Sequence, residues 1–301
     1  MGQDVFHVPV MSREVLEYLD PKAGGVFLDG TLGLAGHSRL MAEKVGDSGR
    51  LICLDRDESS LAKAKENLVS FHGQLNLIHS NFNEFDLVLK KLGVSQVDGM
   101  LFDLGISSFQ LDNLQRGFSF KAEGPLDMRM DQTGSVSAEN LVNELSEEDL
   151  ADIIFQYGEE RYSRRIARSI IQYRKHKRLS TAAELEEIIF TSVPLAYRRQ
   201  RIHPATRTFQ ALRIAVNKEL DSLTALMEKF LDYLKIGGRI AVISFHSLED
   251  RIVKEKFKDL SKKNEISLLF KKPLRPCEDE ININPRARSA RLRVAERIAC
   301  N

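Results

Sequence analysis

A glycine-rich turn is the part of this sequence best suited to bind a ligand. An apolar run at residues 26–28 leads into Asp29-Gly30-Thr31-Leu32-Gly33-Leu34-Ala35-Gly36-His37-Ser38, with a glycine at every third position. Glycine permits tight turns and lets a ligand approach backbone N–H groups, which the start of a helix then presents. The turn therefore predicts a ligand site at the end of a strand.

Asp55 supplies the acidic group that such a site needs. It follows a second apolar run at 51–54, about twenty positions past the glycines, where Rossmann-type sheets hold ribose hydroxyls. The spacing G-x-x-G-x-x-G differs from the G-x-G-x-x-G of dinucleotide sites. Because no pyrophosphate has to be cradled, S-adenosylmethionine is favoured over NAD. A tight turn followed by a helix cap is the purely structural alternative.

Three later strand ends carry further candidate groups. Asp103 ends the run 98–103, where a carboxylate faces the crevice beside a cofactor, or else caps the following turn. Phe82 follows the run 75–79 and either faces an adenine or belongs to the core. His246 follows the run 239–245 and is either a base or a structural residue before a helix.

Strands and helices must alternate to position these groups. Strand patterns at 26–29, 51–54, 75–79, 98–103 and 239–245 are separated by helical patterns at 37–45, 58–69, 83–91 and 217–234. This alternation predicts an α/β fold with a parallel sheet. The rhythm breaks after Asp103, and residues 138–193 read as helices. The tail at 289–298 alternates as a strand and is predicted to lie antiparallel at the sheet edge.

The simplest organisation is therefore one discontinuous domain with an insertion. Residues 1–108 and 209–301 form the predicted Rossmann-like domain, and residues 109–208 form a mostly helical inserted domain. A chain of 301 residues with 43% hydrophobic residues is long enough for both cores.

Charge is balanced overall but concentrated in the insertion. The chain has 44 Lys and Arg against 43 Asp and Glu, whereas residues 155–213 hold thirteen basic and five acidic residues. Arg161, Arg164, Arg165 and Arg168 have the spacing of one helix face, and Arg198, Arg199 and Arg201 form a second cluster. This pattern favours RNA as a partner; a solvated helix face is the alternative.

The remaining composition excludes several classes of site. Cys53, Cys277 and Cys300 are scattered without a C-x-x-C pair, so neither a zinc site nor a disulfide framework is predicted, and no metal is expected. No apolar run approaches membrane length, and a reducing, cytoplasmic setting fits best.

Taken together, the motifs resemble one family, the bacterial 16S rRNA cytosine-N4 methyltransferases of the RsmH (MraW) type. The resemblance begins at His7-Val8-Pro9-Val10-Met11 and rests on the glycine turn, on Asp55-Arg56-Asp57 and on several long, uncommon words. These are Asp103-Leu104-Gly105-Ile106-Ser107-Ser108, Gln110-Leu111-Asp112, Arg116-Gly117-Phe118-Ser119-Phe120, Gly124-Pro125-Leu126-Asp127-Met128-Arg129-Met130-Asp131, Tyr157-Gly158-Glu159-Glu160-Arg161, His203-Pro204-Ala205-Thr206-Arg207, Ser244-Phe245-His246-Ser247 and Asn284-Pro285-Arg286-Ala287-Arg288-Ser289.

The resemblance implies a class I S-adenosylmethionine-dependent methyltransferase domain with an inserted RNA-recognition domain. It implies methylation of a decoding-region cytidine in 16S rRNA, within the small ribosomal subunit. We interpret Asp103 as the catalytic residue, which accepts hydrogen bonds from the cytosine amine; a role in binding the cofactor alone is the alternative. The implied cofactor-binding residues are Ala35, Gly36, His37, Asp55, Phe82, Asp103 and Gln110. Ala35 stands where members of the family often have glycine.

Two other classes of function remain open from the residues alone. An NAD oxidoreductase is disfavoured by the glycine spacing, and an RNA-binding protein that only binds the cofactor is disfavoured by Asp103. The sequence does not define the group that accepts the amine proton. It does not define the oligomeric state either, and a homodimer is one of the states left open.

Overall fold

The computed structural model describes residues 9–120 and 124–299, so His7, Val8 and Cys300 lie outside the described residues. The chain forms two compact units. The first consists of Met1–Gly105 and Leu220–Asn301, and the second is Ile106–Glu219. The predicted boundaries were 108 and 208. Helix α11 (Ala205–Asn217) accounts for the later second boundary, because it packs on α7 and α9 of the second unit.

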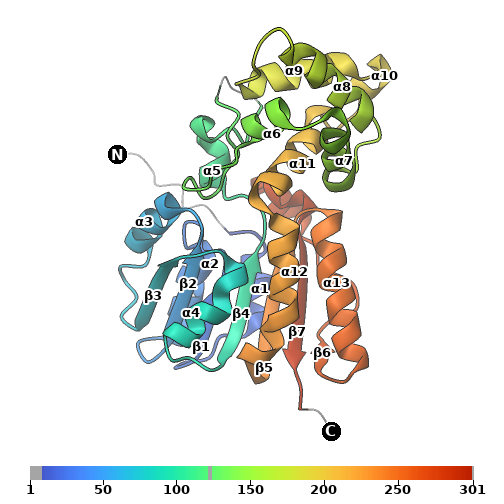
Figure 1. The fold of residues 1–301 in the computed structure, drawn as a ribbon. Helices are drawn as coiled ribbons and strands as arrows, with labels where there is room; N and C mark the ends of the chain where they lie inside the picture. The colour runs from blue at the N-terminus through green and yellow to red at the C-terminus, as the bar shows by residue number, and fades with distance from the viewer. Residues whose placement is uncertain (1–8, 121–123, 300–301) are drawn as a thin grey trace. The chain divides into compact units, whose positions relative to one another are not determined.

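A seven-stranded sheet forms the centre of the first unit, in the order β3-β2-β1-β4-β5-β7-β6 (Figure 1). The strands are β1 (Val26–Asp29), β2 (Arg50–Asp55), β3 (Gln74–His79), β4 (Val97–Asp103), β5 (Leu234–Ser244), β6 (Ile266–Leu268) and β7 (Arg291–Arg297). The first five are parallel and β7 is antiparallel to both of its neighbours. The predicted α/β fold with a parallel sheet is confirmed.

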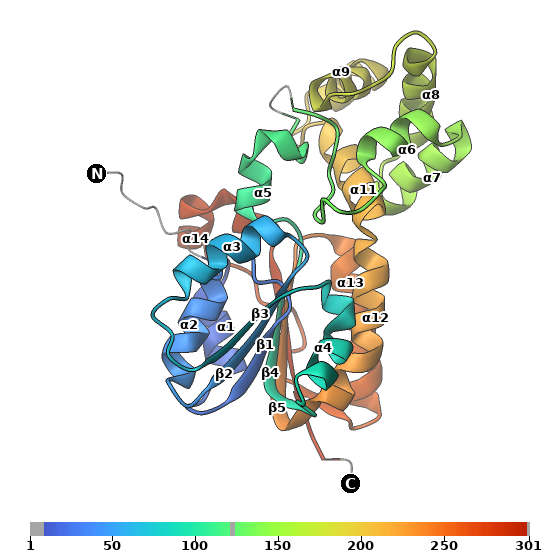
Figure 2. The ribbon, with the colours of Figure 1, turned by 60° about the vertical axis from the view of Figure 1, so that its left-hand side comes forward.

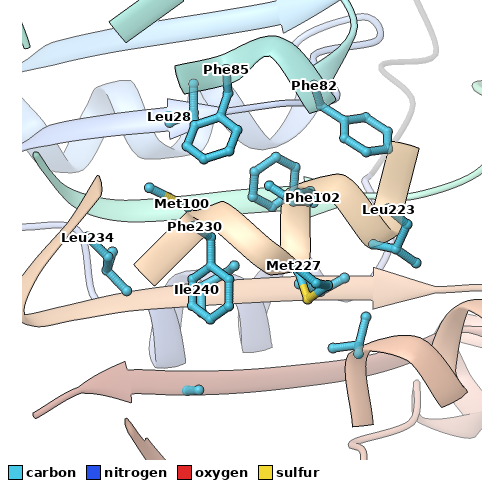
Figure 3. Packing of buried hydrophobic residues seen from close by; sticks show 14 of the residues in the cluster. Leu28, Phe82, Phe85, Met100, Phe102, Leu223, Met227, Phe230, Leu234 and Ile240 are labelled. Atoms are coloured by element: carbon cyan, nitrogen blue, oxygen red, sulfur yellow. The ribbon is translucent and has the colours of Figure 1, made fainter. Parts of the chain in front are cut away.

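Helices cover both faces of this sheet (Figure 2), and a cluster of buried apolar side chains lies on each face. One face packs against α4 (Phe85–Lys91), α12 (Glu219–Lys229) and α13 (Ser247–Lys262), and Figure 3 shows Phe82, Phe102 and Phe230 within that cluster. The other face packs against α1 (Ser12–Leu19), α2 (Gly36–Val45) and α3 (Glu58–Asn67). Burial on both faces explains why these strands read as continuous apolar runs.

The tail strand is antiparallel as predicted, but its predicted place at the sheet edge is wrong. β7 lies between β5 and β6, and β6 forms the edge. Three residues are too few to show an alternating pattern, which is why the sequence did not reveal β6. Short elements η1 (Phe82–Glu84), η3 (Phe230–Tyr233), α14 (Glu278–Ile283) and η4 (Pro285–Ser289) complete the unit.

The second unit is mostly helical and has its own core. Its elements are α5 (Ser108–Asp112), η2 (Leu114–Arg116), α6 (Ala138–Glu144), α7 (Glu147–Gly158), α8 (Ser163–Arg174), α9 (Ala182–Ser192), α10 (Leu195–Arg198) and α11. Capping boxes start α6 at Ser137 and α9 at Thr181, so polar side chains satisfy the first backbone N–H groups. In the part of the chain that the structure describes, no helix is both long and apolar enough for a membrane span.

Candidate active site

Parallel pairing brings the carboxyl ends of β1, β2 and β4 to one edge of the sheet. Asp29 is paired with Cys53 and with Leu101, so Asp55 and Asp103 both lie two positions beyond its level. The chain passes from β3 across to β4, so β1 and β4 flank the topological switch point of the sheet. Ligands of open α/β sheets bind in the crevice at such a point.

The glycine turn follows β1 and ends in an unusual backbone conformation. Ala35 has φ 65° and ψ 25°, a left-handed conformation, and α2 begins at the next residue, Gly36. This conformation costs an L-residue about 1–2 kcal/mol that glycine would not incur. The first backbone N–H groups of α2 are therefore those of Gly36 and His37, directly after the turn. A helix N terminus leaves such groups without intrahelical partners.

Asp29 anchors the turn from within the protein. Its side chain is 2% exposed, its Oδ1 accepts the Thr31 N–H at 3.1 Å, and its Oδ2 accepts the Ser38 hydroxyl at 2.6 Å. Burial raises the pKa of Asp29, while the bond from Ser38 opposes that rise. The carboxyl group joins the start of the turn to the first turn of α2. The sequence pattern did not single out this residue, although Asp29 ends its strand as Asp55 and Asp103 end theirs.

Asp55 closes the other side of the turn. Its Oδ2 accepts the Gly33 N–H at 2.7 Å and its Oδ1 accepts the Asp57 N–H at 2.8 Å. Burial raises the pKa of Asp55 to about 6, and the two backbone hydrogen bonds oppose the rise. Each carboxylate oxygen has a second lone pair for a further donor. Asp57 caps α3, so the helix cap predicted as the structural alternative is present. Asp55 can stabilise the glycine turn and still bind a ligand.

Asp103 and His37 form a pair of incompletely bonded polar side chains. His37 Nε2 lies 3.6 Å from Asp103 Oδ2, and the two side chains are 7% and 25% exposed. Both ring nitrogens of His37 and the Oδ1 of Asp103 are buried and have no hydrogen-bond partner among the described residues. Buried polar atoms normally have partners, so this pair is suited to a polar ligand.

Two other residues predicted to bind the cofactor, Phe82 and Gln110, make contacts within the protein that stabilise the fold. Phe82 is 7% exposed and packs edge-on against Phe102, with ring centroids 5.9 Å apart (Figure 3). Gln110 belongs to the second unit, where it forms a capping box with Ser107 at the start of α5. A contact of either residue with a cofactor stays a prediction.

His246 is the N-cap of α13 and forms a capping box with Glu249. Its Nδ1 accepts the Glu249 N–H at 3.4 Å, which supports the structural interpretation over a catalytic base.

The donor set fits S-adenosylmethionine. The carboxylate of Asp55 suits ribose hydroxyls, the amides at the start of α2 suit polar acceptors, and the unpartnered atoms of His37 and Asp103 suit a further polar group. The strand order with an antiparallel β7 between β5 and β6 is that of Rossmann-like methyltransferases. Fold and site thus define an S-adenosylmethionine-dependent methyltransferase.

Residues 4–298 match the MraW methylase family, and the chain belongs to that family. Curated relatives cover nearly the whole chain. It is 49% identical to the ribosomal RNA small subunit methyltransferase H of Syntrophotalea carbinolica, over 99% of this chain and 100% of that protein. It is 47% identical to the protein of the same name from Brevibacillus brevis, over 97% of this chain and 98% of that protein. The corresponding protein of Halothermothrix orenii is 46% identical, with the same coverage.

Thr31 connects the glycine turn to Asp103 and provides a first test of the site. The Asp103 N–H donates to Thr31 Oγ1 at 2.6 Å. Thr31→Val keeps the shape but leaves this N–H without its acceptor, so we expect the free energy of unfolding to fall by about 1–3 kcal/mol. Thr31→Ser keeps the acceptor and is the matched control. Urea denaturation that gave equal stabilities for the two variants would contradict this role.

Proposed function

We propose that this protein transfers a methyl group to N4 of a cytidine in the decoding region of 16S rRNA. The observation that carries the proposal is the identity of 46–49%, over almost the full length, with proteins named for the small ribosomal subunit RNA. The site supports it, because a carboxylate stands at the tip of β4 beside the glycine turn.

The chemistry requires orientation more than a strong base. When bound, S-adenosylmethionine would supply an electrophilic methyl group: the methyl–sulfur bond would break as the bond to N4 forms, S-adenosylhomocysteine would leave, and the amine would lose one proton. The exocyclic amine of cytosine is a weak nucleophile, since its lone pair is conjugated with the ring. The Asp103 carboxylate accepts a hydrogen bond from this amine and so holds N4 in line for transfer. The Thr31 hydroxyl holds the backbone of Asp103 in place, and no covalent adduct with the base is needed.

The substrate base has to be accessible as a single nucleotide. A cytosine that is stacked and paired cannot reach a carboxylate inside a protein site, so the base is unpaired or flipped when it binds. The proposed substrate is rRNA within the small ribosomal subunit, in the cytoplasm.

Transfer of labelled methyl groups tests the proposal directly. Small subunits that lack the modification are incubated with the protein and labelled S-adenosylmethionine, and the product nucleoside is identified after digestion. N4-methylcytidine at one decoding-region position is the expected product. Methylation of another base, of protein, or of no component would refute the proposed substrate.

We assign RNA recognition to the second unit on the basis of its exposed arginines. Arg164, Arg165 and Arg168 are exposed on α8, and Arg168 forms a surface ion pair with Glu147 at 3.3 Å. The predicted inclusion of Arg161 in this helix face is wrong, because α8 begins at Ser163. An exposed ion pair contributes little to stability, so these side chains remain suitable for phosphate.

Replacing these three arginines by glutamate is expected to weaken RNA binding. Each arginine that neutralises a phosphate releases counterions, so the triple variant should bind small subunits more weakly and with a flatter dependence on salt. Cofactor affinity should change little, because Asp55 and the glycine turn belong to the first unit. If the triple variant binds small subunits as tightly as the wild type at every salt concentration, these arginines do not contact RNA and the helix face is only solvated.

A further inference from the structure

Four flat side chains of the second unit contact one another in succession. Phe120 stacks on His203 with ring centroids 4.7 Å apart and planes 23° apart, and His203 stacks on Phe190 at 5.9 Å and 16°. The guanidinium of Arg198 lies over the Phe190 ring, 5.0 Å from its centroid. We call these four residues the stacking cluster. All four are partly exposed, so this is not simply a buried core.

Hydrogen bonds hold the polar members of the stacking cluster in fixed orientations. Arg198 donates from Nε to the Val193 carbonyl at 3.1 Å and from Nη2 to the Thr191 carbonyl at 2.8 Å. His203 Nδ1 accepts the Ala205 N–H at 3.3 Å, and its Nε2 lies 3.2 Å from a carboxylate oxygen of Glu186. Such groups lose little further freedom when a flat ligand binds them.

A second arginine–aromatic group adjoins the first through α10. The guanidinium of Arg161 lies 4.8 Å from the Tyr162 ring centroid and 5.0 Å from that of Tyr197. The Tyr197 hydroxyl donates to the buried carboxylate of Glu160 at 2.5 Å, which fixes the ring. Because Tyr197 directly precedes Arg198, the short helix α10 carries one member of each group.

The surface beside these groups combines exposed apolar side chains with positive charge. Leu195 and Ile202 are 59% and 56% exposed, and Arg199 and Arg201 are exposed between them. Residues 188–218 contain six Arg or Lys and no Asp or Glu. Glu186 and Glu160, the neighbouring acids named above, already bond His203 and Tyr197.

Unpaired RNA has the complementary chemistry, since it presents flat apolar bases along an anionic backbone. Proteins bind such strands with aromatic and guanidinium planes next to a positive groove. A duplex hides its base faces and would use only the charges. An acidic protein segment would match the charge but would not need fixed planes or exposed Leu195 and Ile202.

We propose that the α10 surface, made of Leu195, Arg198, Arg199, Arg201, Ile202 and His203, binds unpaired nucleotides of the RNA substrate by stacking. The proposal rests on the proposed function, in that the ligand is RNA. It adds a structural preference, for single strands over duplex, and it assigns this preference to residues other than the α8 arginines. Arg198 provides the plane, whereas Arg199 and Arg201 neutralise phosphates.

Binding of a labelled RNA oligonucleotide of about 12 nucleotides to the full chain tests this surface. We expect the single strand to bind at least fivefold more tightly than the same strand annealed to its complement. Arg198→Lys keeps the charge but removes the plane, and should weaken single-strand binding about tenfold with an unchanged salt slope. The double variant Arg199→Ala/Arg201→Ala should instead flatten the salt slope.

Two further variants separate stacking from loss of structure. Ile202→Ser alters an exposed side chain, so it should leave thermal stability unchanged and still weaken single-strand binding. Arg164→Lys changes an exposed arginine of α8 that is not a member of the stacking cluster, and it should leave the preference for single strands intact. Equal binding of single strand and duplex, or full single-strand affinity in both Arg198→Lys and Ile202→Ser, would overturn the proposal.

Methyl transfer by the wild-type protein is measured in parallel and distinguishes the two proposals. If methylation of small subunits occurs without any preference for single strands, the α10 surface is wrong and the proposed function stands. If the preference is present and small subunits are not methylated, the proposed substrate is wrong and the α10 surface stands.

Discussion

Asp103→Asn is expected to reduce methyl transfer by about 10²–10⁴-fold while the protein remains folded. The amide matches the carboxylate in shape but carries no charge and has only one oxygen to accept from an amine. The reduction should appear in the single-turnover rate at saturating S-adenosylmethionine and small subunits. Under these conditions weakened binding does not affect the rate, so the measurement reports the transfer step.

The surroundings of Asp103 make this variant interpretable. Its backbone N–H is held by Thr31, and one side-chain oxygen has no partner among the described residues, so the substitution breaks few bonds of the folded state. Asp98→Asn, at the other end of β4, is the matched control. Asp98 bonds Lys235 and the Val26 N–H, so its loss should lower stability but spare the rate. A near-normal rate in Asp103→Asn would remove Asp103 from the mechanism.

Asp55→Ala is expected to weaken S-adenosylmethionine binding by at least about 100-fold. The variant loses charge-assisted hydrogen bonds to ribose, each worth about 1.5–3 kcal/mol, and also the bonds that Asp55 accepts from Gly33 and Asp57. Asp55→Asn keeps part of this geometry and should bind with intermediate affinity. Titration calorimetry on folded protein measures both; unchanged affinity in Asp55→Ala would exclude the ribose contact.

The raised pKa of Asp55 adds a pH signature to this prediction. With a pKa of about 6, the carboxyl is ionised at pH 7.5 and largely protonated at pH 5, so cofactor affinity should fall as the pH is lowered through 6. For folding the sign is opposite. The folded state binds this proton more tightly than the unfolded state, so protonated Asp55 stabilises the fold at low pH. This contribution to the free energy of unfolding declines as the pH rises from about 4 to 6. Asp29 also has a raised pKa, and comparison with Asp55→Ala separates the two.

The strand ends were predictable because buried parallel strands leave a clear signal. Apolar runs followed by glycine or aspartate identified β1, β2 and β4 within a residue or two, and with them Asp55 and Asp103. The bonds within the site were not predictable in this way. The contact of Thr31 with Asp103 joins residues 72 positions apart, which no local pattern reveals.

Helix boundaries in the second unit were harder to predict, for a physical reason. The spacing of Arg161 and Arg164 fits a helix, but Glu160 bonds the Tyr162 N–H and the backbone turns there instead. The contact of Arg198 with Phe190 joins α10 to α9, and the contact of Arg161 with Tyr197 joins α10 to the turn before α8. The charge pattern therefore predicted an RNA-binding helix face, but it could not predict the stacked aromatic and guanidinium groups of the second unit.

The position of β4 has a consequence for synthesis of the chain. β4 pairs with β1 on one side and β5 on the other, and the second unit of about 110 residues is made between β4 and β5. In all, 130 residues separate the end of β4 from the start of β5, so at about 5–20 residues per second the free edge of β4 waits roughly 6–26 s for its partner. Its residues Met100, Leu101 and Phe102 are apolar and wholly buried in the finished sheet. The nascent chain thus exposes an unpaired apolar strand edge during this time, and such an edge can pair with a strand of another chain.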